Sequence, residues 1–342
     1  MRRRDFFATL RGAAAWQFIG ALGDSMLAGP SVAEEAERKR RIGVLMAHPA
    51  SDPEFQQYAA AFRDGLRKFG WIEGRNISFE FRWGALDDPE VRSRSAKELV
   101  VLRPDLILTQ NTPPTASTLQ QTRSIPIIFV IVAHPIGSRF VESLSRPGGN
   151  VTGFTIMEPT IAGRWVQLLK EIAPHVTHAA LLFNPATAPY ADIYIRPFKA
   201  AATSFSLEAI STPVNNVAEL EGAIAAEARV PNGGIVVIPD GFLNVHRKTI
   251  VSLTAHHKLP AIYAWPFFPE MMGGLMSYGS DQRESFRLAA AYADRILKGE
   301  KPFDLPVQAP TEYKLVINLE TAKVLGLTVS QQLQQLADKL IE

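Results

Sequence analysis

Short apolar runs alternate with helix-like amphipathic segments along most of the chain. The run at residues 41–46 is typical of a buried parallel strand, and similar runs recur at 105–110 and 125–132. An Asp-Pro-Glu sequence at 52–54 supplies a helix cap, a proline at the first helical position and a first-turn acid. Regular alternation of strands and helices predicts parallel sheets with right-handed crossovers.

The same cycle runs twice, before and after the Gly-rich stretch at residues 145–154. The loop His48-Pro-Ala-Ser-Asp-Pro53 is matched 136 residues later by Asn184-Pro-Ala-Thr-Ala-Pro189. Pro126-Ile-Ile-Phe129 is matched 134 residues later by Pro260-Ala-Ile-Tyr263. A repeat as long as a domain predicts two similar lobes rather than a solenoid.

The second half continues beyond the repeat. We expect a strand at 273–279, a helix at 282–298, an extended segment at 305–317 and a closing helix at 329–341. A tail that returns across both lobes adds a second and a third connection to the one at 145–154. Such connections form a three-segment hinge.

The first 33 residues have the features of an export signal. A basic start with the twin-arginine-like Arg3-Arg4-x-Phe6-Phe7 precedes an Ala-rich apolar run, and Ser31-Val32-Ala33 is a small-x-small cleavage site. The apolar run is too short and too interrupted for a retained membrane anchor. The alternative is a basic cytoplasmic N-terminus. We expect cleavage near Ala33 and a periplasmic mature protein.

Charge and cysteine content exclude several classes of function. The chain of 342 residues has a net charge of +2, and removal of residues 1–33, with four Arg and two Asp, leaves about zero. A nucleic-acid binder needs a basic surface, so no nucleic-acid partner is expected. There is no Cys, which excludes disulfides and thiolate metal sites.

Ligands of open α/β sheets bind beyond the carboxyl ends of the strands, so the strand-end loops of two facing lobes define the predicted site. Asn111, Thr112 and Thr115 form a polar helix start with free backbone N–H groups, suited to a carboxylate. Asp240 follows a strand of the other lobe and suits a ligand ammonium. An ordinary helix cap and an Asx turn are the alternatives for these two features.

The remaining candidate residues come from the same loops. Tyr263 and Tyr278 are expected to stack on the ligand or shield it. His48 and His134 stand at strand ends of the first lobe, Asn184 at one of the second, and Phe154 at the floor of the cleft.

Catalytic and metal-binding motifs are scarce. The chain has no Gly-x-Ser-x-Gly elbow, Walker A loop or Gly-x-Gly-x-x-Gly stretch. His246, His256 and His257 share a predicted helix at spacings that do not bring them onto one metal. We therefore predict no catalytic residue, no metal and no cofactor.

Several strings along the chain are long enough to be specific. They are Arg41-Ile-Gly-Val-Leu, Leu144-x-Arg-Pro-Gly-Gly-Asn-Val-Thr-Gly153, Asn184-Pro185, Gly273-Gly-Leu-Met-Ser-Tyr-Gly279 and Asn318-Leu-Glu-Thr-Ala-Lys-x-Leu-Gly326. They resemble the substrate-binding protein family of ABC transporters, which includes tryptophan- and tyrosine-type solute receptors. The resemblance covers the chain from Arg41 to its end.

This resemblance implies a type I periplasmic-binding-protein fold with two Rossmann-like α/β lobes, each a parallel sheet flanked by helices. It implies lobe 1 at 38–152 plus 274–302, and lobe 2 at 153–273 plus 303–342. It also implies capture of a small molecule by lobe closure and delivery to an ABC permease of the inner membrane.

We expect a monomeric, non-enzymatic receptor for an aromatic or hydrophobic amino acid. The alternatives are a receptor for a chemotaxis or sensor protein, a regulatory ligand domain, and a periplasmic enzyme on the same scaffold. A regulatory domain needs an N-terminal DNA-binding helix pair, which residues 1–40 do not supply. An enzyme requires turnover that depends on His134 or His48.

Overall fold

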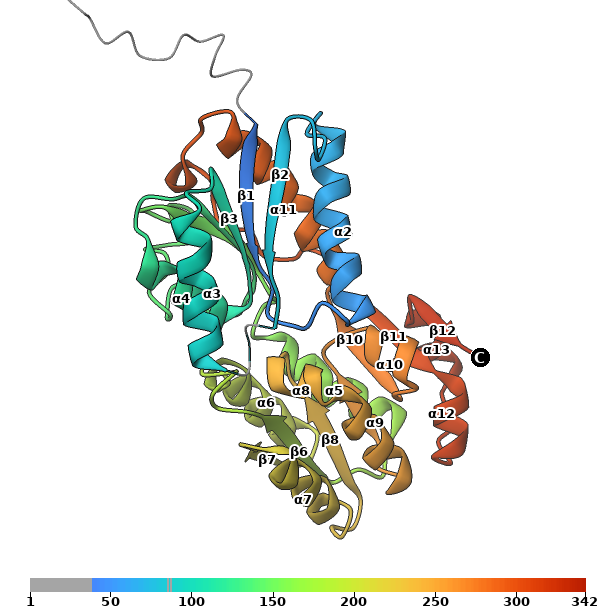
Figure 1. The fold of residues 1–342 in the computed structure, drawn as a ribbon. Coiled ribbons are helices and arrows are strands. Elements are labelled where there is room, and N and C mark those ends of the chain that lie inside the picture. The colour runs from blue at the N-terminus through green and yellow to red at the C-terminus, as the bar shows by residue number, and fades with distance from the viewer. Residues whose placement is uncertain (1–38, 85, 87) are drawn as a thin grey trace, which may run out of the picture. The chain divides into compact units, whose positions relative to one another are not determined.

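Two separate sheets organise the part of the chain that is described (Figure 1). The computed structural model describes residues 39–84, 86 and 88–342. The predicted export signal at residues 1–33 lies outside this part. Among the helices of the described residues, none has the length and apolar composition needed to cross a membrane.

The first sheet contains five parallel strands in the order β2-β1-β3-β4-β5. These are β1 (Arg40–Leu45), β2 (Ile77–Arg82), β3 (Leu106–Gln110), β4 (Ile127–Val132) and β5 (Val151–Thr155). Its helices are α2 (Pro53–Lys68), α3 (Pro89–Val101), α4 (Thr112–Gln121) and, from far later in the chain, α11 (Gln282–Leu297).

Strand alternation divides the residues of this sheet between two faces. Ile42 and Val44 lie in the cluster that contains Phe62 of α2 and Phe286 of α11. Leu45, from the opposite face of β1, packs with Leu99 of α3. Successive side chains of a strand point to opposite faces, so a fully apolar strand is buried by helices on both sides. The buried parallel strand predicted at 41–46 is confirmed.

The second sheet has seven strands in the order β12-β11-β10-β9-β8-β6-β7, and β11 is antiparallel to β10. Its strands are β6 (His178–Phe183), β7 (Glu208–Pro213), β8 (Gly233–Val237), β9 (Ala261–Tyr263), β10 (Met276–Gly279), β11 (Lys314–Asn318) and β12 (Lys339–Ile341). Its helices are α5 (Ile161–Ile172), α6 (Asp192–Ser204), α7 (Val217–Glu227), α8 (Gly241–Val245), α9 (Arg247–His256), α10 (Phe267–Met272), α12 (Leu319–Val324) and α13 (Gln331–Leu336).

The chain passes between the sheets three times. The first crossing follows β5 and the second joins β10 to α11. Before the third, the chain runs through the 3-10 turn η1 (Pro302–Asp304) and lies beside β5, where Gln308 N donates to the Gly153 carbonyl at 3.0 Å. The predicted two-lobed α/β fold is confirmed.

The structure corrects the predicted lobe boundaries. β5 lies wholly in the first sheet, so the first crossing begins after Thr155 rather than at 153. β10 belongs to the second sheet, although 274–302 was assigned to lobe 1. Residues 305–308 attach to the first sheet, since Thr152 Oγ1 donates to the Leu305 carbonyl at 2.6 Å.

Two further expectations are wrong. The closing helix predicted at 329–341 ends at Leu336, and Lys339–Ile341 pairs with β11 as an edge strand. Gly153, expected in the hinge, lies in β5, where an added Cβ would approach the Phe129 carbonyl oxygen to 2.0 Å. Glycine is therefore required for strand packing within the first lobe.

Candidate functional site

The carboxyl-end loops of the two sheets contact one another. Leu86, after β2, lies against Gly241 at the start of α8, where an added Cβ would stand 2.4 Å from Leu86 Cδ2. Asp52, at the start of α2, is ion-paired with Arg247 of α9 at 2.6 Å. Segments from both lobes therefore meet where α/β sheets bind ligands.

Arg247 is fixed by three neighbours. Its Nη2 donates to Asp52 Oδ2, its Nη1 donates to the Asn244 carbonyl at 2.8 Å, and its guanidinium lies over the Phe267 ring. The side chains of Arg247 and Asp52 are only 10% and 12% exposed. The other Asp52 oxygen accepts from Glu54 N at 3.1 Å and caps α2. One carboxylate thus starts a helix and joins the two lobes.

His48 lies beside this bridge. Its ring stacks on Phe55 at a centroid distance of 3.6 Å and is 1% exposed, and Nδ1 has no hydrogen-bond partner. Burial, and then the positive charge of Arg247, lower the pKa of His48 to about 3. The imidazole is therefore neutral at physiological pH, and Nδ1 is free to bond to a ligand.

The helix start at residues 111–115 does not form the predicted cradle of free N–H groups. Asn111 Oδ1 accepts from Thr112 N, and Thr115 N donates to the Asn111 carbonyl. Pro113 and Pro114 have no N–H to offer. Thr115 Oγ1 is also engaged, with the Asn111 carbonyl at 2.7 Å. The buried Thr112 hydroxyl remains without a partner and is a donor available to a ligand.

Asn184 and Asp240 are brought together, but as a structural pair. Asp240 Oδ2 accepts from Asn184 N, and Oδ1 accepts from Thr187 Oγ1 and Phe242 N. Burial raises the pKa of Asp240 to about 6 against these donors, so it is ionised at neutral pH. Its oxygens hold two loops together and cap α8, so Asp240 already has a structural role, and its contact with a ligand ammonium stays a prediction. Asn184 Oδ1 likewise caps its own loop.

The other four predicted residues are dispersed. Tyr263 is buried inside lobe 2, stacked on Phe268 and hydrogen-bonded to Thr254, and its expected ligand contact stays a prediction. Tyr278 is half-buried beside Tyr313. His134 is exposed at the end of β4, and Phe154 packs on Tyr292.

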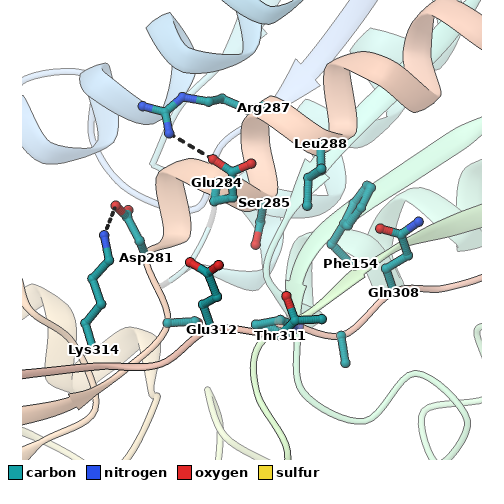
Figure 2. A pocket seen from close by; sticks show the side chains of 13 residues that line it. Phe154, Asp281, Glu284, Ser285, Arg287, Leu288, Gln308, Thr311, Glu312 and Lys314 are labelled. Carbon is teal, nitrogen blue, oxygen red and sulfur yellow. Dashed lines mark hydrogen bonds and ion pairs between the residues drawn. The ribbon is translucent and has the colours of Figure 1, made fainter.

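Phe154 lines a cavity of about 400 Å³ at the hinge, seen in Figure 2. Its lining comes from Phe154 at the end of β5, just before the first crossing, from Ser280 in the second crossing and from the segment 308–314. Two of its charged pairs are internal, Arg287 with Glu284 at 2.9 Å and Lys314 with Asp281 at 3.5 Å. The shape of this cavity therefore depends on how the crossings are arranged.

A smaller cavity of about 40 Å³ lies between the first turn of α2 and the loop after β9. Glu54 and Tyr58 line it from α2, Trp265 from lobe 2, and Gln282 from the start of α11. This space exceeds what one water molecule needs. The cavity adjoins the interlobe bridge, because Glu54 follows Asp52 in the same helical turn.

Unpartnered polar atoms concentrate at the strand ends. In the described part of the chain, eight buried side-chain polar atoms lack a hydrogen-bond partner. Five belong to segments that leave the carboxyl ends of β1, β3, β8, β9 and β10: His48 Nδ1, Thr112 Oγ1, Asn244 Oδ1, Trp265 Nε1 and Gln282 Nε2. Buried polar atoms are normally paired, so these five atoms at the strand ends make this region the candidate site.

Comparison of the chain with known proteins identifies its family. Residues 41–341 match the family model described as ABC transporter substrate binding protein. The chain belongs to this family. A relative named tyrosine-binding protein, from Clostridioides difficile (strain R20291), is 26% identical over an alignment of 321 residues that covers 90% of this chain and 90% of the relative.

Solved structures of similar proteins share the fold over nearly the whole chain. An ABC domain from Streptococcus pneumonia in complex with L-Trp has a TM-score of 0.81 at 27% identity, covering 89% of this chain and 100% of that one. A conserved domain protein from Vibrio cholerae matches with the same TM-score and coverage at 26% identity. The resemblance stated from the sequence is confirmed.

Reasoning from the sequence missed the residues that best define the site in this family member. Asn244, Trp265 and Arg247 were not among the candidate residues, and Glu54 and Gln282 entered only as parts of predicted helix starts. Only Gln282 has a local signal, since it directly follows the Asp281 cap of α11. The others gain their significance from residues that are distant in sequence.

Proposed function

We propose that this substrate-binding protein is exported and serves an ABC importer by capturing an aromatic amino acid between its lobes. The observation that carries the proposal is the set of five unpartnered polar atoms at the strand ends of both sheets. A ligand that bonds to both lobes stabilises their joined arrangement, which is how such receptors report occupancy to a partner. The membrane partner is an ABC permease.

The chemistry of the five atoms suits a zwitterion. Trp265 Nε1, Thr112 Oγ1 and Gln282 Nε2 are donors that suit a carboxylate. Asn244 Oδ1, and His48 Nδ1 in the tautomer that carries its proton on Nε2, are acceptors that suit an ammonium. A free amino acid carries both groups on one carbon. The tyrosine-binding relative and the L-Trp complex support an aromatic side chain.

Calorimetric titration of the purified protein with the standard amino acids tests the proposal. We expect L-tyrosine or L-tryptophan to bind and to raise the melting temperature, because a ligand that binds only the folded state stabilises it. Absence of binding by every amino acid would refute the ligand class.

A pair of variants then tests the location of the site. Trp265→Phe removes one unpartnered N–H and should weaken binding about tenfold, the magnitude of a hydrogen bond to a charged group. Trp71→Phe is the matched control, since Trp71 Nε1 donates to Asp294 Oδ1 within lobe 1. Equal affinities of the two variants for the amino acid would show that Trp265 does not contact the ligand and would refute this location of the site.

A further inference from the structure

Glu54 is buried although its position in the chain does not require it. It lies in the first turn of α2, after the cap Asp52 and Pro53, and is 5% exposed. The same Asp-Pro-Glu sequence opens α3, where Glu90 is exposed. A first-turn acid stabilises a helix from a solvent-exposed position, as Glu90 does. Helix stabilisation therefore does not explain why Glu54 is buried.

Glu54 also lacks a cation. No Lys, Arg or His of the described residues forms an ion pair with its carboxylate. Arg283 is the cation whose charge acts on it, but Arg283 bonds to Asp281 at 3.2 Å and to Gln57 Oε1. Burial accordingly raises the pKa of Glu54, opposed by a hydrogen bond from Tyr58. Buried carboxylates in proteins are normally paired, so this one is missing its partner.

The surroundings of Glu54 indicate what that partner is. Glu54 lines the small cavity between the lobes together with Trp265 and Gln282, whose N–H groups are buried and unpartnered. Glu270, Asp281, Arg283 and Lys314 also line it, but Glu270 is ion-paired with Lys339, and Asp281 with Arg283 and Lys314. Among the described residues, Glu54 is therefore the lining carboxylate without a cation, and it lies beside two neutral donors. A ligand that carries a cationic group beside an anionic one could bond to the Glu54 carboxylate and to both N–H donors.

We propose that Glu54 accepts the ammonium group of the bound amino acid and selects for ligands that carry a free α-amine. This inference rests on the proposed function, because it assigns a role within the same interlobe site. It adds a charged acceptor from the first lobe to the neutral ammonium acceptors His48 and Asn244, a part that Asp240 leaves open because its oxygens already bond to Asn184, Thr187 and Phe242. The Trp265 and Gln282 donors then face the carboxylate of the same head group.

Titration of the wild-type protein with three ligands tests the selectivity directly. The ligands are L-tyrosine, its des-amino analogue 3-(4-hydroxyphenyl)propanoate, and N-acetyl-L-tyrosine. We expect L-tyrosine to bind at least about tenfold more tightly than either analogue, since a charge-assisted bond in a buried site contributes a factor of that order. Equal affinity for L-tyrosine and the des-amino compound would overturn the inference without any variant.

Glu54→Gln then assigns the selectivity to this residue. The variant should bind L-tyrosine about 10 to 100 times more weakly, while its affinity for the des-amino compound stays within about threefold. Glu90→Gln is the matched control and should leave all three affinities unchanged. A parallel loss for both ligands in Glu54→Gln would show a structural role and overturn the assignment.

The outcomes separate this inference from the proposed function. If the wild type binds no amino acid, the proposed function itself fails. If the wild type binds L-tyrosine or L-tryptophan and Glu54→Gln retains full affinity for it, the function stands and the role of Glu54 is wrong.

Discussion

The interlobe ion pair between Asp52 and Arg247 should hold the lobes together before any ligand binds. Both side chains are nearly buried, and the atoms are 2.6 Å apart. Removing one member of a fully buried pair costs about 3–5 kcal/mol, and a charge-assisted bond contributes about 1.5–3 kcal/mol. Arg247 keeps its bond to the Asn244 carbonyl, so we expect about 2 kcal/mol.

Two variants probe this contribution. Asp52→Asn retains a good helix cap but removes the charge. Arg247→Met retains an apolar stem against Phe267 and leaves Asp52 unpaired. A shift of about 2 kcal/mol changes the ratio of joined to separated lobes about 30-fold. Because the pair is buried, the effect should persist at high salt.

Fluorescence energy transfer between the lobes measures that ratio. The chain has no Cys, so dyes attach only at introduced positions, and the exposed Lys68 of α2 and Lys199 of α6 are suitable. Lys339→Met is the control, since it breaks the exposed pair with Glu270 within lobe 2. Unchanged transfer in Arg247→Met, or a coupling energy below about 0.5 kcal/mol in the double-mutant cycle, would refute the reasoning.

Two predictions concern stability. Because the pKa of His48 is held near 3 in the folded state, against 6.5 when unfolded, the unfolded chain binds the proton first as pH falls. The His48 contribution to the free energy of unfolding should therefore drop by about 2 kcal/mol between pH 6.5 and 5. In urea unfolding measured at several pH values, His48→Gln should remove this part of the dependence of the free energy of unfolding on pH. An identical pH dependence in the variant and the wild type would contradict this. Asp240→Asn places an N–H₂ or a weaker acceptor against three donors and should cost about 2–3 kcal/mol, with faster amide exchange in the loop at 184–188. The exposed Asp192→Asn serves as its control, and equal unfolding midpoints would refute the role of Asp240.

Much of the fold follows from local sequence signals. The helix predicted at 282–298 matches α11, and the Asp-Pro-Glu start predicted at 52–54 matches α2. These succeed because apolar periodicity and capping act over a few residues. The closing helix failed at Lys339 because pairing with β11, a tertiary contact, determines the conformation there.

The site was harder to predict because residue type at a strand end does not determine its role. Asp240 and Asn111 were selected as polar residues after strands, and both serve as helix caps, which is the commonest use of such residues. Arg247 is 195 residues from Asp52, and no local pattern indicates that the two meet. Ligand-facing residues are distinguished by missing partners, which only the folded structure reveals.

The first turn of α2 contains a helix cap, the interlobe ion pair and the proposed ammonium acceptor. Asp52 caps the helix through Oδ1 and holds Arg247 of the other lobe through Oδ2, and Glu54 N is the group that is capped. An ammonium bound at Glu54 would therefore contact the same helical turn that holds the Asp52–Arg247 ion pair. If the bridge supplies part of the free energy of closure in advance, the ligand has less to supply, and its apparent affinity rises with the population of joined lobes. Arg247→Met should then weaken the binding of L-tyrosine and of its des-amino analogue by the same factor, whereas Glu54→Gln discriminates between them.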